Sequence, residues 1–115
     1  MHKIFVMPFA EVYPHYVNKV ERKGRTVQEL HEVIRWLTGY TDKDLKRLIK
    51  DKTNFTDFFL DAKLHPNAPL ITGSICGVKI QDIEDPLMQK IRYMDKLVDE
   101  LAKGRPLEKI LRTNS

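Results

Sequence analysis

A helix-start signal, in which a hydroxyl side chain is followed three positions later by a carboxylate, occurs twice in the first half of the chain. Thr26 precedes Glu29, and Thr41 precedes Asp44. In each pair the hydroxyl can accept a hydrogen bond from the backbone of the acidic residue, and the carboxylate can return one. Gly39 stands between the two pairs and is suited to end the first helix. The spacing predicts two helices joined by a three-residue turn.

Proline and glycine delimit two further helices. A helix that crosses Pro14 should break or kink, because proline lacks the backbone N–H and its ring crowds the preceding turn. We therefore expect the first helix to begin at Pro14 and to end at Gly24. Asp85 can cap a long helix in which Pro86 takes the first position. That helix is expected to run to about Lys103.

The rest of the chain predicts short elements. Thr53 or Asn54 can cap a short helix through the segment 55–62, and Pro106 can open a last one. The segment 71–80 mixes β-branched residues with glycine, and a strand, a turn of helix and an irregular packed segment all remain open. With 115 residues, 42% of them hydrophobic, the chain predicts one all-α domain over 1–115, a bundle of five or six helices with this glycine-containing segment before the long penultimate helix.

Charge and cysteine content set the expected environment. The formal net charge is +4, which makes the protein mildly basic, and the single cysteine cannot form an intramolecular disulfide. No run of about 18 apolar residues is present, so no membrane span is expected. A cytoplasmic location is the simplest interpretation.

Three stretches carry a resemblance to a known family. They read "MPFAEVYPHYVNKVERKG", "GRTVQELHEVIRWLTGY" and "LITGSICGVKIQDIEDPLMQKIRYMDKLVDELAKG". The chain, from about Ile4 to Arg112, resembles the uncharacterised bacterial family catalogued as domain of unknown function 2200. The resemblance implies a small, mostly helical cytoplasmic bacterial protein, and it carries over no activity, ligand or catalytic residue.

Cys76 is the weak candidate for a catalytic residue. A catalytic thiol needs a lowered pKa and access to substrate, and no histidine stands at a spacing that predicts a partner. Because Cys76 lies between Ile75 and Gly77 in an apolar stretch, we expect a buried structural thiol. A small-molecule enzyme or ligand binder near Cys76 is the third-ranked hypothesis.

No metal or cofactor is predicted. His31 and Glu32 begin like a zinc-binding HExxH motif, but Arg35 stands where the second histidine is required. Gly73 and Gly77 lack the lysine followed by serine or threonine that a phosphate-binding loop needs.

Nucleic acid is the stronger alternative partner. The two capped helices have the form of a helix-turn-helix, with Gly39 in the turn. The second helix carries four cations that could contact phosphates: Lys43, Lys46, Arg47 and Lys50. A lysine-rich outer face is also ordinary for a solvated helix.

Two further sets of residues are candidates for binding. Four side chains could line a small ligand pocket, although aromatic residues in so small a domain usually fill the core: Tyr13, Tyr16, Arg35 and Trp36. The long helix carries an apolar seam through which two copies could form a homodimer: Leu87, Ile91, Met94, Val98 and Leu101. A helix must bury a similar stripe against its own domain, so monomer and homodimer are both open.

The residues thus favour a non-catalytic interaction or regulatory module, self-associating or not, over an enzyme. A nucleic-acid-binding helical domain ranks second.

Overall fold

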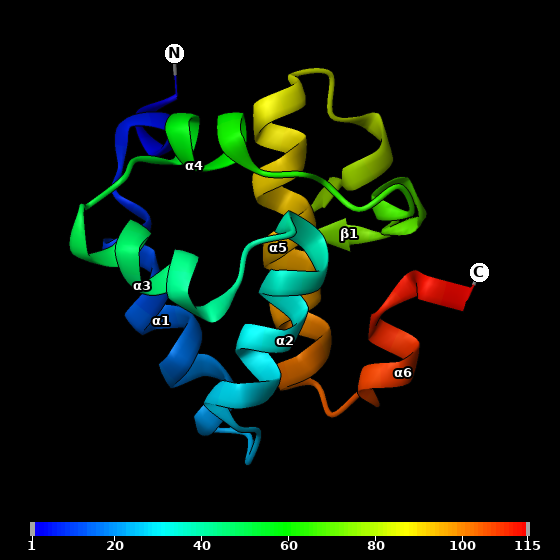
Figure 1. The fold of residues 1–115 in the computed structure, drawn as a ribbon. Helices are drawn as coiled ribbons and strands as arrows, with labels where there is room; N and C mark the ends of the chain where they lie inside the picture. The colour runs from blue at the N-terminus through cyan, green and yellow to red at the C-terminus, as the bar shows by residue number, and fades with distance from the viewer. Residues whose placement is uncertain (1, 115) are drawn as a thin grey trace.

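Six α-helices dominate the computed structural model, which describes residues 2–114 (Figure 1). They are α1 (Phe9–Glu21), α2 (Val27–Thr38), α3 (Asp42–Lys50), α4 (Phe55–Asp61), α5 (Pro86–Ala102) and α6 (Leu107–Ile110). Short 3-10 helices are η1 (Lys3–Val6), η2 (Ala68–Leu70), η3 (Ile80–Asp82) and η4 (Arg112–Asn114), and one antiparallel hairpin pairs β1 (Ser74–Ile75) with β2 (Val78–Lys79). The predicted all-α class is confirmed. The glycine-containing segment before α5, for which strand, helix turn and irregular structure were all open, contains the short β1–β2 hairpin.

Both predicted capping boxes are present. The Thr26 hydroxyl accepts from the Glu29 backbone N–H at 3.1 Å, and the Glu29 carboxylate accepts from the Thr26 N–H at 3.0 Å. The same exchange joins Thr41 and Asp44 at 3.1 and 2.9 Å. Gly39 ends α2 in the left-handed conformation, with φ of 75°. These local signals fix where α2 and α3 begin and where the turn between them lies.

The helix α5 is the central element, and α1, α2, α4 and α6 all pack against it (Figure 1). Its start is as predicted, since the Asp85 carboxylate accepts from the N–H groups of Leu87 and Met88. The apolar seam is consumed by this packing. Four of its five side chains are at most 1% exposed: Ile91, Met94, Val98 and Leu101. The fifth, Leu87, is partly buried and packs against the same core. In this fold the seam packs inside the monomer and is not an exposed surface.

The start of α1 differs from the prediction. The helix begins at Phe9 and runs through Pro14 rather than beginning there. Its first turn is fixed by tertiary contacts: the Phe9 N–H donates to the Thr53 carbonyl at 2.8 Å, and the Phe9 ring stacks on Phe58 with centroids 4.5 Å apart. Burial of Phe9 holds the helix together across the proline.

Aromatic side chains of α4 form the part of the core that surrounds Phe9. Phe55, Phe58 and Phe59 are at most 2% exposed and contact one another edge-on or stacked. The Tyr40 hydroxyl donates to the Phe58 carbonyl at 2.5 Å. Asn54 caps α4 by accepting from the Asp57 N–H at 2.9 Å, as expected. Leu60, on the opposite side of α4 from these phenylalanines, is left at the surface.

Candidate functional site

A chain of polar side chains joins α1, α2 and α3 on one face. The Tyr13 hydroxyl lies 2.5 Å from Nε2 of His31, and Nδ1 of His31 lies 3.2 Å from a carboxylate oxygen of Asp42. The other Asp42 oxygen lies 3.5 Å from the guanidinium of Arg35. The four side chains therefore form one continuous network, of which Tyr13 and Arg35 were predicted as ligand-binding residues.

The chemistry of this network is that of a brace between helices. Burial raises the pKa of Tyr13, and the carboxylates of Asp42 and Glu21 raise it further. A tyrosine with a raised pKa stays a neutral phenol at neutral pH, which makes it a hydrogen-bond donor and a poor nucleophile. Tyr13 is thus suited to hold His31 in place.

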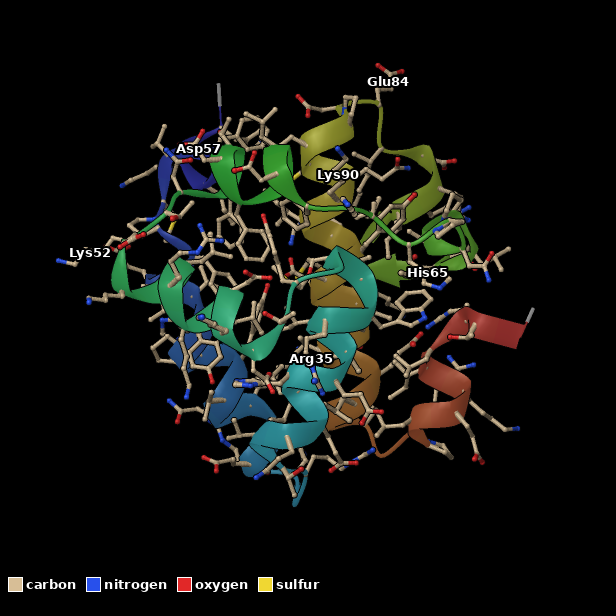
Figure 2. The ribbon with its side chains drawn as sticks, in the orientation of Figure 1. Arg35, Lys52, Asp57, His65, Glu84 and Lys90 are labelled. Carbon is tan, nitrogen blue, oxygen red and sulfur yellow. The ribbon has the colours of Figure 1, made fainter. Side chains whose placement is uncertain are left out.

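The other two residues of the predicted pocket have separate partners. The Tyr16 hydroxyl donates to the Asp95 carboxylate on α5 at 2.5 Å, and burial followed by that carboxylate raises the pKa of Tyr16 well above its usual range. Trp36 stacks on His65, with centroids 4.2 Å apart. Figure 2 shows His65 near α2 and the C-terminal segment, away from Arg35. The structure does not gather the four predicted residues around one ligand.

Cys76 is exposed, so the expectation of a buried thiol is wrong. It occupies the tip of the β1–β2 hairpin together with Gly77, and both have positive φ, 53° and 79°. Two central residues with positive φ define the tight turn that matches the twist of two paired strands. Two residues between the β-branched Ile75 and Val78, the second of them a glycine, were the signal for this turn. The turn directs the thiol outward.

The four cations proposed for nucleic acid all lie exposed on α3. Arg47 lies 3.6 Å from Asp44, and the lysines have no ion pair among residues 2–114. The three-residue turn before α3 is present. However, the backbone of α3 lies mainly against α1 and little against α2, which its first residue Asp42 contacts through side chains. The two helices of a helix-turn-helix pack on each other instead.

An apolar groove that the sequence did not reveal lies between α4 and the start of α5. Its volume is about 310 Å³, and its lining residues are Thr56, Phe59, Leu60, Asp85, Pro86, Leu87 and Lys90. Leu60 is 77% exposed, more than any other large hydrophobic side chain among residues 2–114. The signal for it is the spacing on α4: burial of Phe55, Phe58 and Phe59 leaves Leu60 on the opposite side of the helix.

Two charged side chains in the groove differ in their partners. The Asp85 carboxylate is engaged in capping α5. Lys90 is only partly exposed, and within residues 2–114 it has neither an ion pair nor a hydrogen bond to its side chain. Figure 2 shows Lys90 beside the end of α4 and Asp57 towards the start of that helix. A second hollow, of about 510 Å³, adjoins the groove at Asp85 and is lined by His2, Lys3 and Phe5.

Within residues 2–114, no three side chains of His, Cys, Asp or Glu lie close enough together to hold a metal ion. None of the helices described has the length and apolar character needed to cross a bilayer.

Comparison with known proteins places the chain in a family. The model of a family described as "uncharacterized protein conserved in bacteria (DUF2200)" matches residues 3–112. A crystal structure of uncharacterized protein SP1917 is 46% identical, with a TM-score of 0.90 over 96% of this chain and 93% of that one. No curated protein matches. With nearly its whole length matched, the chain belongs to the DUF2200 family.

Proposed function

We propose that the protein is a non-catalytic, cytoplasmic interaction module that docks a protein segment in the α4–α5 groove. The observation that carries the proposal is Leu60, 77% exposed at the rim of an apolar groove. Burying a leucine side chain contributes about 1.5–3 kcal/mol. Leu60 forms one contiguous apolar surface with the Phe59, Pro86 and Leu87 side chains of the groove. Contiguous apolar surfaces of this kind mark sites that another protein covers.

The polar side chains elsewhere support an interaction module over an enzyme. The tyrosine hydroxyl groups of α1 bond to other helices of the fold: Tyr13 to His31 on α2, and Tyr16 to Asp95 on α5. All buried side-chain nitrogen and oxygen atoms of the described residues have a hydrogen-bond partner. Polar groups with such partners stabilise the fold. The apolar groove, in contrast, has the side chain of Leu60 exposed to solvent.

Position-specific photo-crosslinking in bacterial cells tests the proposal. A crosslinking amino acid at position 60 is expected to give a discrete protein adduct, and the same amino acid at the exposed Glu32 position is expected to give none. The adduct partner is identified by mass spectrometry and purified. It must bind the wild-type chain and lose about tenfold in affinity with Leu60→Asp. The absence of a discrete adduct at position 60, or equal binding by the variant, contradicts the proposal.

A second candidate, nucleic-acid binding, is favoured by the cations of α3. Lys43, Lys46 and Lys50 recur at helical spacing on an exposed face, and each is available to a phosphate. Asp42 and Asp44 at the start of the same helix oppose phosphate binding, which places this candidate second.

Fluorescence anisotropy with labelled duplex DNA and single-stranded RNA separates the two candidates. Binding through α3 should weaken steeply with salt, with a log–log slope of about one unit per phosphate contact. Lys46→Glu should then abolish the signal, and Lys109→Glu on α6 should leave it unchanged. No anisotropy change at low salt removes this candidate.

A further inference from the structure

We propose that the α4–α5 groove binds a second copy of this chain, so that two grooves face each other across a two-fold axis. This inference rests on the proposed function and names the partner at that same site. It moves self-association from the buried seam of α5 to the exposed surface formed by α4 and the first turn of α5.

The apolar part of this surface is self-complementary. Leu60 lies at the rim of the groove, and Phe59, Pro86 and Leu87 line it. The surface therefore offers both a protruding side chain and a hollow to receive one. In a two-fold contact each surface meets its own copy, so Leu60 of each chain can enter the groove of the other.

The charges at the same surface are complementary as well. Lys90 lines the groove, and no carboxylate of residues 2–114 lies within ion-pair distance of it. Asp57 stands on α4 three residues before Leu60, is exposed, and likewise has no ion pair among these residues. A partner for this groove should therefore present an apolar side chain with a carboxylate one helical turn away, and α4 itself presents both.

The two-fold arrangement brings these charges together. Asp57 lies on the first turn of α4 and Leu60 on its last turn. Lys90 of α5 lies beside the end of α4 (Figure 2). When two α4 helices approach antiparallel, the start of each lies against the end of the other. Asp57 of each chain then faces Lys90 of its partner, which gives two equivalent ion pairs that flank the exchanged leucines.

Native mass spectrometry and sedimentation velocity of the purified wild-type chain form the first measurement. The mass should rise from one chain to two as the concentration increases from low to high micromolar. Leu60→Asp should raise the dissociation constant by about tenfold or more, since it places a carboxylate in the apolar hollow. Leu70→Asp changes an exposed leucine on η2 and serves as the matched control that leaves the constant unchanged.

Charge reversal gives the sharper test. In an Asp57→Lys dimer, the introduced lysine of each chain faces Lys90 of the other. In a Lys90→Glu dimer, the introduced glutamate of each chain faces Asp57 of the other. Because like charges repel, each variant should dimerise about tenfold more weakly. An equal mixture of the two variants should recover the wild-type constant as a heterodimer. In that heterodimer one ion pair joins the introduced lysine of one variant and the introduced glutamate of the other. The second ion pair joins the original Lys90 and Asp57. The recovery also shows that both variants are folded.

The outcomes are decisive in both directions. Dimerisation of the wild-type chain, its loss in the single variants and its return in the mixture support the inference. A wild-type chain that stays monomeric, single variants that bind like wild type, or a mixture that does not recover overturns it. A monomeric chain whose residue-60 crosslinker captures a protein of another sequence overturns this inference alone, whereas no adduct at position 60 overturns the proposed function.

Discussion

The guanidinium of Arg112 holds the carboxylate of Glu100 with two hydrogen bonds of 2.7 and 2.9 Å, and so ties the C-terminal segment to α5. The Glu100 side chain is only 8% exposed, and Arg105 adds a third bond at 3.0 Å. Next to this pair, Trp36 Nε1 donates to the Thr113 hydroxyl at 2.7 Å. The end of the chain is therefore held on the bundle by charged and polar contacts around one buried carboxylate.

Arg112→Met should destabilise the fold by about 2 kcal/mol. Breaking a buried ion pair leaves an uncompensated charge, at a typical cost of about 3–5 kcal/mol, and Arg105 reduces that cost here. Urea unfolding followed by the fluorescence of Trp36, the only tryptophan, reports the loss. Lys109→Met, at an exposed position of α6, is the control and should stay within about 0.5 kcal/mol of wild type. Equal midpoints for the two variants would contradict the assigned role.

Stability should fall as the pH drops from about 5 towards about 2, in part through Glu29. Hydrogen bonds from Arg25, then from the Thr26 backbone, lower the pKa of Glu29 from 4.5 to about 2. Because the folded-state pKa is depressed, the contribution is complete above the unfolded value of 4.5 and is lost as pH falls through the folded one. With the Glu29 side chain 26% exposed, solvent screening reduces the contribution to about 1 kcal/mol.

The matched comparison is Glu29→Gln, which cannot titrate. Urea midpoints of wild type and variant should differ at neutral pH, and the difference should shrink as the pH falls below 4.5 and disappear only below the folded pKa of about 2. Asp44 shifts in the same direction, chiefly through the Thr41 backbone N–H, and this background is common to both proteins. A constant difference between the two across the whole range would mean that the Arg25 bond to Glu29 adds no stability.

Local chemistry accounts for the parts of the fold that the sequence predicts well. The capping boxes at Thr26 and Thr41, the left-handed Gly39 and the Asp85 cap each involve residues within four positions of one another. Their hydrogen bonds form whenever the chain turns into a helix, so no knowledge of distant residues is needed.

The features that the sequence did not predict depend on distant residues. The helix α1 crosses Pro14 because Phe9 is anchored against Phe58 from α4. The groove exists because α4 lies beside the start of α5, which nothing in either segment encodes alone. Exposure of Leu60 is readable from its spacing on α4, but the hollow beside it is not.

Cys76→Asn should stabilise the protein by about 0.5–1 kcal/mol. Cys76 has φ of 53°, a conformation that costs energy for most L-residues and that asparagine tolerates well. The side chain is exposed at the hairpin tip, so the substitution removes no core contact. The midpoint of thermal unfolding measures the gain, and Cys76→Val is the opposite control, expected to be less stable than wild type because a β-branched residue fits this conformation poorly. A Cys76→Val variant as stable as Cys76→Asn would contradict the turn geometry.

Pro14→Ala should stabilise the protein by about 1–2 kcal/mol. Pro14 is exposed inside α1, where its ring crowds the preceding turn and no N–H is available for the helix. Alanine restores that donor, and its greater freedom in the unfolded chain takes back about 0.4–1 kcal/mol. The control is Pro86→Ala at the first position of α5, where no N–H bond is lost to proline, and it should be slightly destabilising. If urea unfolding shows no gain in stability for Pro14→Ala, α1 accommodates the proline ring without cost. The burial of Phe9 would then not be needed to hold the helix together across Pro14.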